Sequence, residues 1–476
     1  MKQVSVPALL SVLLVSGCAI GPDYAAPEPP SDLSFSDITR EGGAVIETSL
    51  SVEAAWWERF EDPRLTALIE TAAVSNTDIR LAVHRVEEAR ASRVIAQARR
   101  IPNLVGSSTG ARLQSSETAG GFGAPPGAPS IQNLFDLGAV MTWELDLFDR
   151  LGRLETAAEA RLEATEDDRR AVMVAVFAEI GIAYAELRGQ QAQFEVAGRN
   201  IDLASQSVEL TQLLVERDLA PEFDMVRARA DVTELTARRH RLLAGQRAAA
   251  ARIAVLTGQP PADVMDTLLA TGPQMTPAAR IPVGLPSELL RRRADIRAAE
   301  RRLAAASEQI GAEMADLLPS FSLTGAAGLA SANLEDLFDA GAQTWSLGGG
   351  AQWSIFSGGA QRADIAIARS RFGAAGADYD AAVLNALAEV ETALASYVYT
   401  ARELDGLSAA RGDRERAYEL AQLRYRSNTD SLFPALDAGL RLTALNAEIA
   451  QRRQDQLVAQ INVYRALGGG WAALED

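Results

Sequence analysis

Few residues in this chain of 476 amino acids are suited to catalysis or metal binding. The two histidines, His84 and His240, fall within helical patterns and have no serine or cysteine nucleophile at a recognisable spacing. The single cysteine, Cys18, excludes an intrachain disulfide and a cysteine-based zinc site. The glycine triplets at 348–350 and 468–470 lack the spacing and the lysine of a phosphate-binding loop. We therefore predict no enzymatic activity, no catalytic residue, no metal site and no bound cofactor.

The composition favours a large helical protein that does not bind nucleic acid. Hydrophobic residues make up 48% of the chain and aromatic residues only 6%. This is ample material for a packed core, and the abundant alanine favours closely packed helices. The net charge of -17 disfavours binding to a polyanion. No apolar run approaches the ~18–20 residues of a transmembrane helix, so we expect no helical span.

The N-terminus has the pattern of an export signal. A short apolar stretch ends in the small residues Ser16 and Gly17, directly before Cys18. This resembles a bacterial lipoprotein signal, in which the cysteine becomes the lipidated first residue of the mature chain. An ordinary cleavage site beside an unmodified cysteine is the alternative. We predict a signal peptide at 1–17 and a lipid-anchored N-terminal tether at 18–62.

The chain contains the same unit twice. Residue 78 aligns with residue 295, an offset of 217 that persists to Pro102 and Pro319. From Trp143, which aligns with Trp353, the offset is 210. A single change of offset, confined to a Gly- and Pro-rich loop, is what a duplicated domain produces. The predicted organisation is a first repeat at 63–257, a linker at 258–285, a second repeat at 286–467 and a C-terminal tail at 468–476.

Each repeat is predicted to contain a helix, two strands and two helices. The first helix is expected near 64–100 and ends before Pro102. Apolar residues then alternate at 135–147, and in the second repeat at 321–329 and 345–355. Such segments of about 10 residues are typical of transmembrane β-strands, the alternative being half-buried strands of a soluble sandwich. Four strands are too few to close a barrel, and a strand edge cannot stay unpaired in the hydrocarbon core of a membrane. If these strands span a membrane, several chains must therefore share one barrel.

Two long helical hairpins are predicted after the strand pairs. Apolar residues recur at alternating spacings of 3 and 4 over 173–215, and again, shifted by 210, over 383–425. This heptad pattern is typical of helices coiled along each other. A continuous helix over 152–219 would be roughly 100 Å long. Turns are expected at 218–221 and 427–430, at the ends of the hairpins far from the strands.

Together these features resemble the TolC family of outer-membrane efflux ducts, in particular its lipidated NodT/OprM-like branch. Trp56-Trp57, followed by Phe60, Asp62-Pro63 and Leu65, is similar to the opening motif of that branch. The most specific signature of the branch is matched by Gly284-Leu285-Pro286-Ser287, followed by Asp295-Ile296-Arg297 and Pro319-Ser320, which are similar to it. Residues 423–438 look like its helix-tip motif. The resemblance covers essentially the whole mature chain.

The resemblance implies a mainly helical fold with a membrane β-barrel portion. It implies a homotrimer in which a 12-stranded β-barrel, four strands per chain, continues into a 12-helix periplasmic α-barrel. The location implied is the outer membrane, with a covalent lipid on Cys18 and the helices extending into the periplasm.

The function implied is that of a passive exit duct of a tripartite efflux pump for small molecules. Its expected partners are outer-membrane lipid, a periplasmic adaptor (membrane fusion) protein and an inner-membrane pump of the RND type. A type I secretion duct, a metal-efflux duct and a periplasmic coiled-coil scaffold lipoprotein are the alternatives.

The resemblance also assigns an aperture to the tip of the second hairpin. In the branch's tip motif, Phe433 would form an apolar ring that repels water. Asp437, one helical turn later, would form an acidic ring that discriminates by charge. Tyr425 would tether neighbouring helices. Ordinary coiled-coil packing of Phe433 is the alternative.

This chain departs from the motif at three tip positions. Asn428 stands where glycine is usual, although asparagine tolerates the left-handed turn conformation. Pro434 replaces a residue that is acidic in some relatives, and Asp430 replaces one that is arginine in some. The second acidic ring and the arginine latch of those relatives are therefore in doubt.

Overall fold

The computed structural model describes residues 20–27, 38, 46–47, 55–114, 131–272, 275–277, 280–283 and 291–474. The predicted signal peptide, the predicted lipidation site Cys18 and the motif at 284–287 lie outside the described residues.

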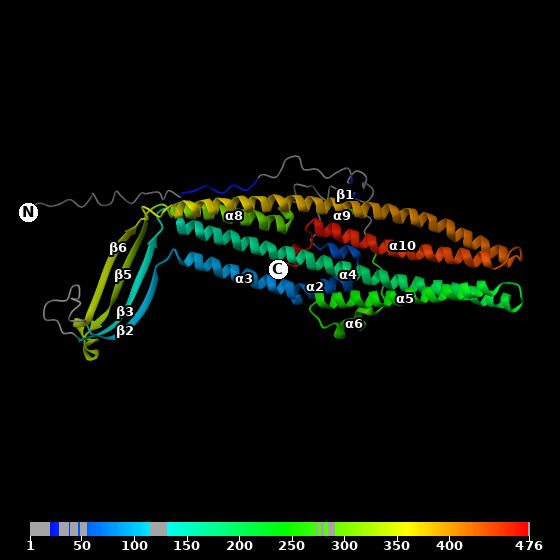
Figure 1. The fold of residues 1–476 in the computed structure, drawn as a ribbon, viewed down its shortest axis with the longest axis horizontal. Coiled ribbons are helices and arrows are strands. Elements are labelled where there is room, and N and C mark those ends of the chain that lie inside the picture. Colours follow the sequence, from blue (N-terminus) through cyan, green and yellow to red (C-terminus); the bar gives the residue numbers. More distant parts are fainter. Residues whose placement is uncertain are drawn as a thin grey trace, which may run out of the picture. The chain divides into compact units, whose positions relative to one another are not determined.

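Each repeat contains a helical segment, two strands and two long helices, in the predicted order (Figure 1). The elements of the first repeat are η1 (Trp56–Phe60), α2 (Pro63–Ser75), α3 (Thr77–Ala98), β2 (Asn103–Gln114), β3 (Ile131–Leu145), α4 (Arg150–Glu216) and α5 (Glu222–Leu256). Those of the second are α8 (Ala294–Ala315), β5 (Ser320–Ser331), η2 (Leu334–Asp336), η3 (Ala340–Ala342), β6 (Gln343–Gln352), α9 (Ala360–Arg426) and α10 (Phe433–Ala466). Shorter elements are β1 (Ile46–Glu47), α6 (Pro261–Leu269), β4 (Ile281–Pro282) and η4 (Trp471–Leu474).

The two repeats use the same contacts at equivalent positions. Helices α4 and α9 each span 67 residues. The indole Nε1 of Trp143 donates to the carbonyl of Arg100 at 2.9 Å, and that of Trp353 donates to the carbonyl of Leu317 at 3.0 Å. These residues align through the offsets of 210 and 217 found in the sequence. The duplication therefore preserves individual hydrogen bonds where helix and strand meet.

The single helix predicted near 64–100 is wrong, because Asn76 divides it into α2 and α3. Asn76 has an extended backbone with ψ 133. Its side chain is buried, and Oδ1 accepts hydrogen bonds from the backbone N–H groups of Asp78 and Ile79. Its Nδ2 donates to the carbonyl of Leu256 at 2.8 Å. Asn76 thus caps the N-terminus of α3 and also bonds a helix end 180 residues away.

The four long strands form one antiparallel sheet in the order β2-β3-β5-β6. The central pair joins the repeats, with Leu137 opposite Leu329. Strand β6 ends at Gln352, so Trp353 and Ile355, which the alternating pattern placed in this strand, lie beyond it. Strands β2 and β6 each pair on one side only within the described chain.

The chain divides into two compact units that each draw on both repeats. Unit 1 comprises 1–27, 86–164 and 299–379 and contains the four-stranded sheet. Unit 2 comprises 28–85, 165–298 and 380–476 and contains both hairpin tips. In the part of the chain that the structure describes, no helix is long and apolar enough to cross a membrane.

The core of unit 2 is built around the tryptophans of the opening motif. Trp56 stacks on Tyr464 with ring centroids 5.5 Å apart, and Trp57 packs edge-on against Phe177 at 5.6 Å. Gly470, with φ +115, passes close to Trp56, and an added Cβ there would lie 3.0 Å from its Nε1 atom. The opening motif is therefore a packing motif that joins η1 to α4 and to the end of α10.

A buried hydrogen-bond network continues from this motif. Asp62 caps α2 by accepting a hydrogen bond from the backbone N–H of Arg64, and it also accepts one from the Tyr184 hydroxyl at 2.7 Å. Arg188 donates to the same hydroxyl at 2.9 Å and to the carbonyl of Ala270 at 3.0 Å. Burial, followed by the hydrogen bond to Asp62, raises the pKa of Tyr184 to about 12. The hydroxyl therefore stays protonated at neutral pH and can donate to the carboxylate.

Candidate functional site: the helix tips

The tip of the second hairpin turns through a left-handed residue, as expected for Asn428. Its φ is 50, and the repeat-equivalent Asp218 in the first hairpin has φ 56. The backbone N–H of Asn428 donates to the carbonyl of Tyr425 at 3.0 Å, and that of Thr429 donates to Arg424 at 2.9 Å. These bonds satisfy carbonyl groups at the end of α9 that have no partner within the helix.

An ion pair spans this turn. Asp430 lies 3.1 Å from Arg424 Nη2, and its carboxylate also accepts a hydrogen bond from the backbone N–H of Ser431. Both charged side chains are solvent-accessible, so the pair contributes little to stability, about 0–1 kcal/mol. The residue types at the tip predicted only the loss of an arginine latch at position 430 and did not predict this pair. The sequence shows that residue 430 is an aspartate where some relatives have an arginine. It does not show that Arg424 is the partner of this aspartate.

Phe433 and Asp437 lie near the N-terminus of α10. Phe433 is the first residue of the helix and is 39% exposed in the single chain. Asp437 follows one turn later, so the two side chains lie on the same side of the helix. The carboxylate of Asp437 accepts a hydrogen bond from Arg441 Nε at 2.7 Å. Any acidic ring built from Asp437 therefore has an arginine beside each carboxylate.

The tips carry a concentration of exposed apolar side chains. Tyr425, in the last turn of α9, is 42% exposed, and Phe223, which aligns with Phe433, is 69% exposed. Other exposed apolar residues at or near the tips are Leu213, Leu219, Val226, Leu420 and Leu423. Large apolar patches on a protein surface usually mark contacts with another molecule. The repeat already pointed to Phe223 from the sequence, as the first-hairpin counterpart of Phe433.

A family model described as outer membrane efflux protein matches residues 68–259 and 285–469, which cover both repeats. The chain belongs to the outer membrane efflux protein family. The resemblance drawn from the motifs is confirmed by this match.

Known outer membrane efflux proteins are similar to this chain over nearly their whole length. The chain is 31% identical over 489 residues to the solvent efflux pump outer membrane protein SrpC of Pseudomonas putida, covering 100% of both chains. It is 30% identical to nodulation protein T of Rhizobium leguminosarum bv. trifolii, covering 96% of both. Its structure resembles that of the outer-membrane channel OprN with a TM-score of 0.85 and 33% identity, covering 95% of this chain and 100% of OprN.

This efflux protein is therefore an outer-membrane channel that extends into the periplasm, with the fold of the family's helical and strand portions. A periplasmic scaffold does not account for the match of both strand pairs and both hairpins. The roles of Phe433, Asp437 and Tyr425 remain predictions.

Proposed function

We propose that this efflux protein is the passive exit duct of a tripartite pump. It would conduct small molecules from a periplasmic adaptor and an inner-membrane pump of the RND type to the cell exterior, without catalysis. The proposal is supported by relatives named as outer membrane proteins of solvent, toluene and antibiotic efflux pumps. Their names point to small organic molecules as cargo, rather than to secreted proteins or metal ions.

The sheet supports a trimer. Strands β2 and β6 have unpaired edges in the single chain, and hydrocarbon offers their N–H and C=O groups no partner. Apolar side chains are exposed on these edge strands, including Leu104 and Trp345. Three chains contributing four strands each would close a 12-stranded barrel and place such side chains against lipid. The same threefold assembly would bring the helices together as a 12-helix α-barrel.

The first prediction concerns the mass of the particle. Extracted in mild detergent, the protein should migrate as a single species with the mass of three chains, because a membrane-inserted monomer would leave two sheet edges open. Native mass spectrometry after detergent removal measures this directly. A monodisperse, folded monomer that is extracted without detergent would contradict the duct proposal.

The second prediction concerns Cys18. Mass spectrometry of the N-terminal peptide should show a mature chain that begins with an acylated Cys18. Two or three acyl chains, at about 0.8 kcal/mol per buried CH₂, would anchor it firmly. We expect Cys18→Ser to lose the lipid and still form trimers, because the strands hold the protein in the membrane. An unmodified peptide that starts elsewhere would disprove lipidation.

The exposed tips are proposed to have two partners. Tyr425 would pack against a helix of a neighbouring chain, while the apolar residues around Phe223 would contact the adaptor. Three copies of Phe433 and Asp437 would form stacked rings that narrow the duct. The support is positional, since both residues start one helix at a tip where exposed apolar side chains gather.

A further inference from the structure

A cavity of about 520 Å³ lies among α4, α5 and α10 in unit 2. Its apolar lining comes from Leu235 and Leu242 of α5, Leu440 of α10 and alanines of α4 and α10. Sites for small molecules are mostly apolar cavities of roughly 300–1,000 Å³ that carry a few polar groups. We call this cavity the α4–α5–α10 pocket. Its size and its lining suit a small organic molecule.

Hydrogen bonds and close packing hold α4 against α10 on both sides of this pocket. Away from the tips, Gln193 of α4 donates to the side-chain oxygen of Gln454 of α10 at 3.1 Å. Toward the tips, Gly439 of α10 lies so close to Leu203 of α4 that an added Cβ would be 3.4 Å from its Cδ1 atom. The pocket is therefore formed before a ligand arrives, which lowers the cost of binding.

Asn200 of α4 brings an unused hydrogen-bond acceptor to the pocket. The residue lines the cavity and is only 7% exposed, and its Oδ1 atom accepts no hydrogen bond from any described residue. A buried oxygen without a donor is unfavourable, so a ligand that donates to it gains more than it would at a solvated group. The side-chain amide can also turn about its last torsion and present this oxygen to the cavity.

The charged residues of the pocket form a row along α5. Asp231, Glu234, Arg238 and Arg241 all line it. Glu234 and Arg238 pair with each other. Among the residues that the structure describes, neither Asp231 nor Arg241 has an ion-pair partner. These two residues are about 15 Å apart along the helix, so one end of the pocket has an unpaired negative charge and the other an unpaired positive charge.

Asn200 lies toward the negative end of this row. The guanidinium of Arg239 on α5 lies 4.2 Å from the centroid of the Phe194 ring on α4, which sets the register of the two helices. The helices form an antiparallel hairpin, so moving toward the tip from this contact brings Asn200 level with the part of α5 just after Asp231. The free amide oxygen and the free carboxylate therefore lie in the same part of the pocket.

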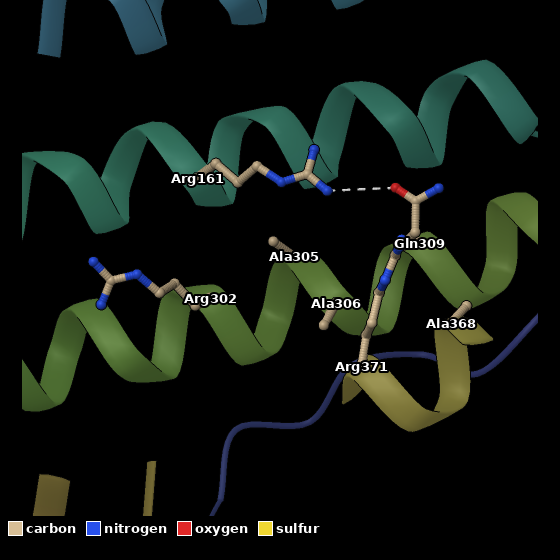
Figure 2. Close-up of a pocket in the computed structure, with 7 residues that line it drawn as sticks. All are labelled: Arg161, Arg302, Ala305, Ala306, Gln309, Ala368 and Arg371. Atoms are coloured by element: carbon tan, nitrogen blue, oxygen red, sulfur yellow. Dashed lines mark hydrogen bonds between the residues drawn. The ribbon is translucent and has the colours of Figure 1, made fainter. Parts of the chain in front are cut away.

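The smaller cavity in Figure 2 differs in this respect. It measures about 180 Å³, lies among α4, α8 and α9 in unit 1, and is lined by Arg161, Arg302 and Arg371. Figure 2 shows Arg161 hydrogen-bonded to Gln309, and Arg302 also has an interaction partner within the chain. Most of its charge is thus already engaged by the protein, whereas both unpaired charges of the α4–α5–α10 pocket are available to a ligand.

We propose that the α4–α5–α10 pocket binds small amphipathic zwitterions. The ammonium group of the ligand lies between Asp231 and Asn200 and donates to both, because charge-assisted hydrogen bonds are the stronger ones. The apolar middle of the ligand covers the leucines and alanines, and its carboxylate pairs with the guanidinium of Arg241. This binding goes beyond the conduction proposed for the duct and does not depend on it.

The third prediction tests the pocket with three probes of equal chain length: 8-aminooctanoic acid, octylamine and octanoate. Each is titrated calorimetrically into the detergent-solubilised full chain, and the heat measured with protein-free detergent is subtracted. The zwitterion should bind at least about fivefold more tightly than either singly charged probe, because it alone reaches both unpaired charges.

Single substitutions separate the two ends of the pocket. Asp231→Asn should weaken binding of the zwitterion and of octylamine at least about threefold and leave octanoate unchanged. Arg241→Gln should weaken the zwitterion and octanoate and leave octylamine unchanged. Asn200→Ala should weaken only the two amines. Alanine stands at the equivalent position 410 of the second repeat, so the long helix accommodates it.

The matched controls are Asp202→Asn on α4 and Arg229→Gln on α5, which remove exposed charges that do not line the pocket. Both should leave all three affinities unchanged. Equal affinity for the three probes, no binding to the assembled protein, or an equal loss of all three probes in Asn200→Ala would overturn the proposal. A protein that binds the zwitterion but forms no channel in planar bilayers would contradict the proposed duct and leave the pocket standing.

Discussion

Replacing Phe433 with alanine is expected to raise the single-channel conductance of the assembled duct at least about twofold. Phe433 begins α10 at the tip and is partly exposed, so three copies can project into a common constriction. Removing the three phenyl groups would widen this constriction and let water fill it more easily. The measurement is conductance of purified trimers in planar bilayers, at matched salt and voltage.

Phe223→Ala is the matched control for this change. Phe223 aligns with Phe433 in the first repeat and is even more exposed, but Arg227 stands where the second repeat has Asp437. We expect Phe223→Ala to change conductance less. Asp437→Ala should mainly lower the preference for cations, by less than an isolated carboxylate ring would, because Arg441 already lies beside each carboxylate. Unchanged conductance and selectivity in both second-repeat variants would exclude these residues from the aperture.

Gly258→Ala should lower the stability of the folded chain by about 2–4 kcal/mol. Gly258 follows α5 with φ +67, a left-handed conformation that costs an alanine about 1–2 kcal/mol. In addition, the new Cβ would lie 2.3 Å from the carbonyl oxygen of Ser75, at the break between α2 and α3. Backbone must move to relieve this contact. The readout is the apparent melting temperature in detergent, compared at one scan rate.

The repeat provides a graded comparison. Gly468 occupies the equivalent position with φ +69, but an added Cβ would lie 3.1 Å from Cγ and 3.3 Å from Cα of Arg293, a much milder overlap than the 2.3 Å contact at Gly258. Gly468→Ala should therefore destabilise the chain less than Gly258→Ala. Gly198→Ala, within α4 and with nothing within 4 Å of an added Cβ, should be neutral or stabilising by up to about 1 kcal/mol. Equal melting temperatures for all three variants would show that the helix ends tolerate a side chain.

The residue pattern alone was sufficient to identify the repeated architecture. The two offsets found in the sequence align helix bounds, left-handed turns and individual hydrogen bonds such as those of Trp143 and Trp353. Alternation with a period of 2 identified β3, β5 and β6, the repeat implied a strand at the position of β2, and the 3.5-residue period identified the hairpins. These signals are local, because side chains on one face of a strand or helix recur at fixed spacings.

The pattern could not locate the interruption of the first helix or the end of β6. Asn76 lies in the run Ser75-Asn76-Thr77-Asp78, whose residue types favour a helix N-cap, but such residues also occur within helices and do not by themselves fix a break. Its buried amide bonds the carbonyl of Leu256, which only folding brings close. Likewise, Trp353 continues the alternating pattern but lies beyond β6, where its indole bonds the carbonyl of Leu317. Such boundaries depend on hydrogen-bond partners that are distant in the sequence.

For the candidate sites, too, some features follow from the sequence and others only from the tertiary structure. The sequence by itself determined the repeated fold, the family, and the positions of Phe433 and Asp437 one helical turn apart. Only the tertiary structure decided that Asp437 is bonded to Arg441, which an exposed helix face permits but does not require. It alone brought together Arg161, Arg302 and Arg371, which come from three helices and line one cavity. Their proximity depends on how α4, α8 and α9 pack, and packing joins residues that no local period relates.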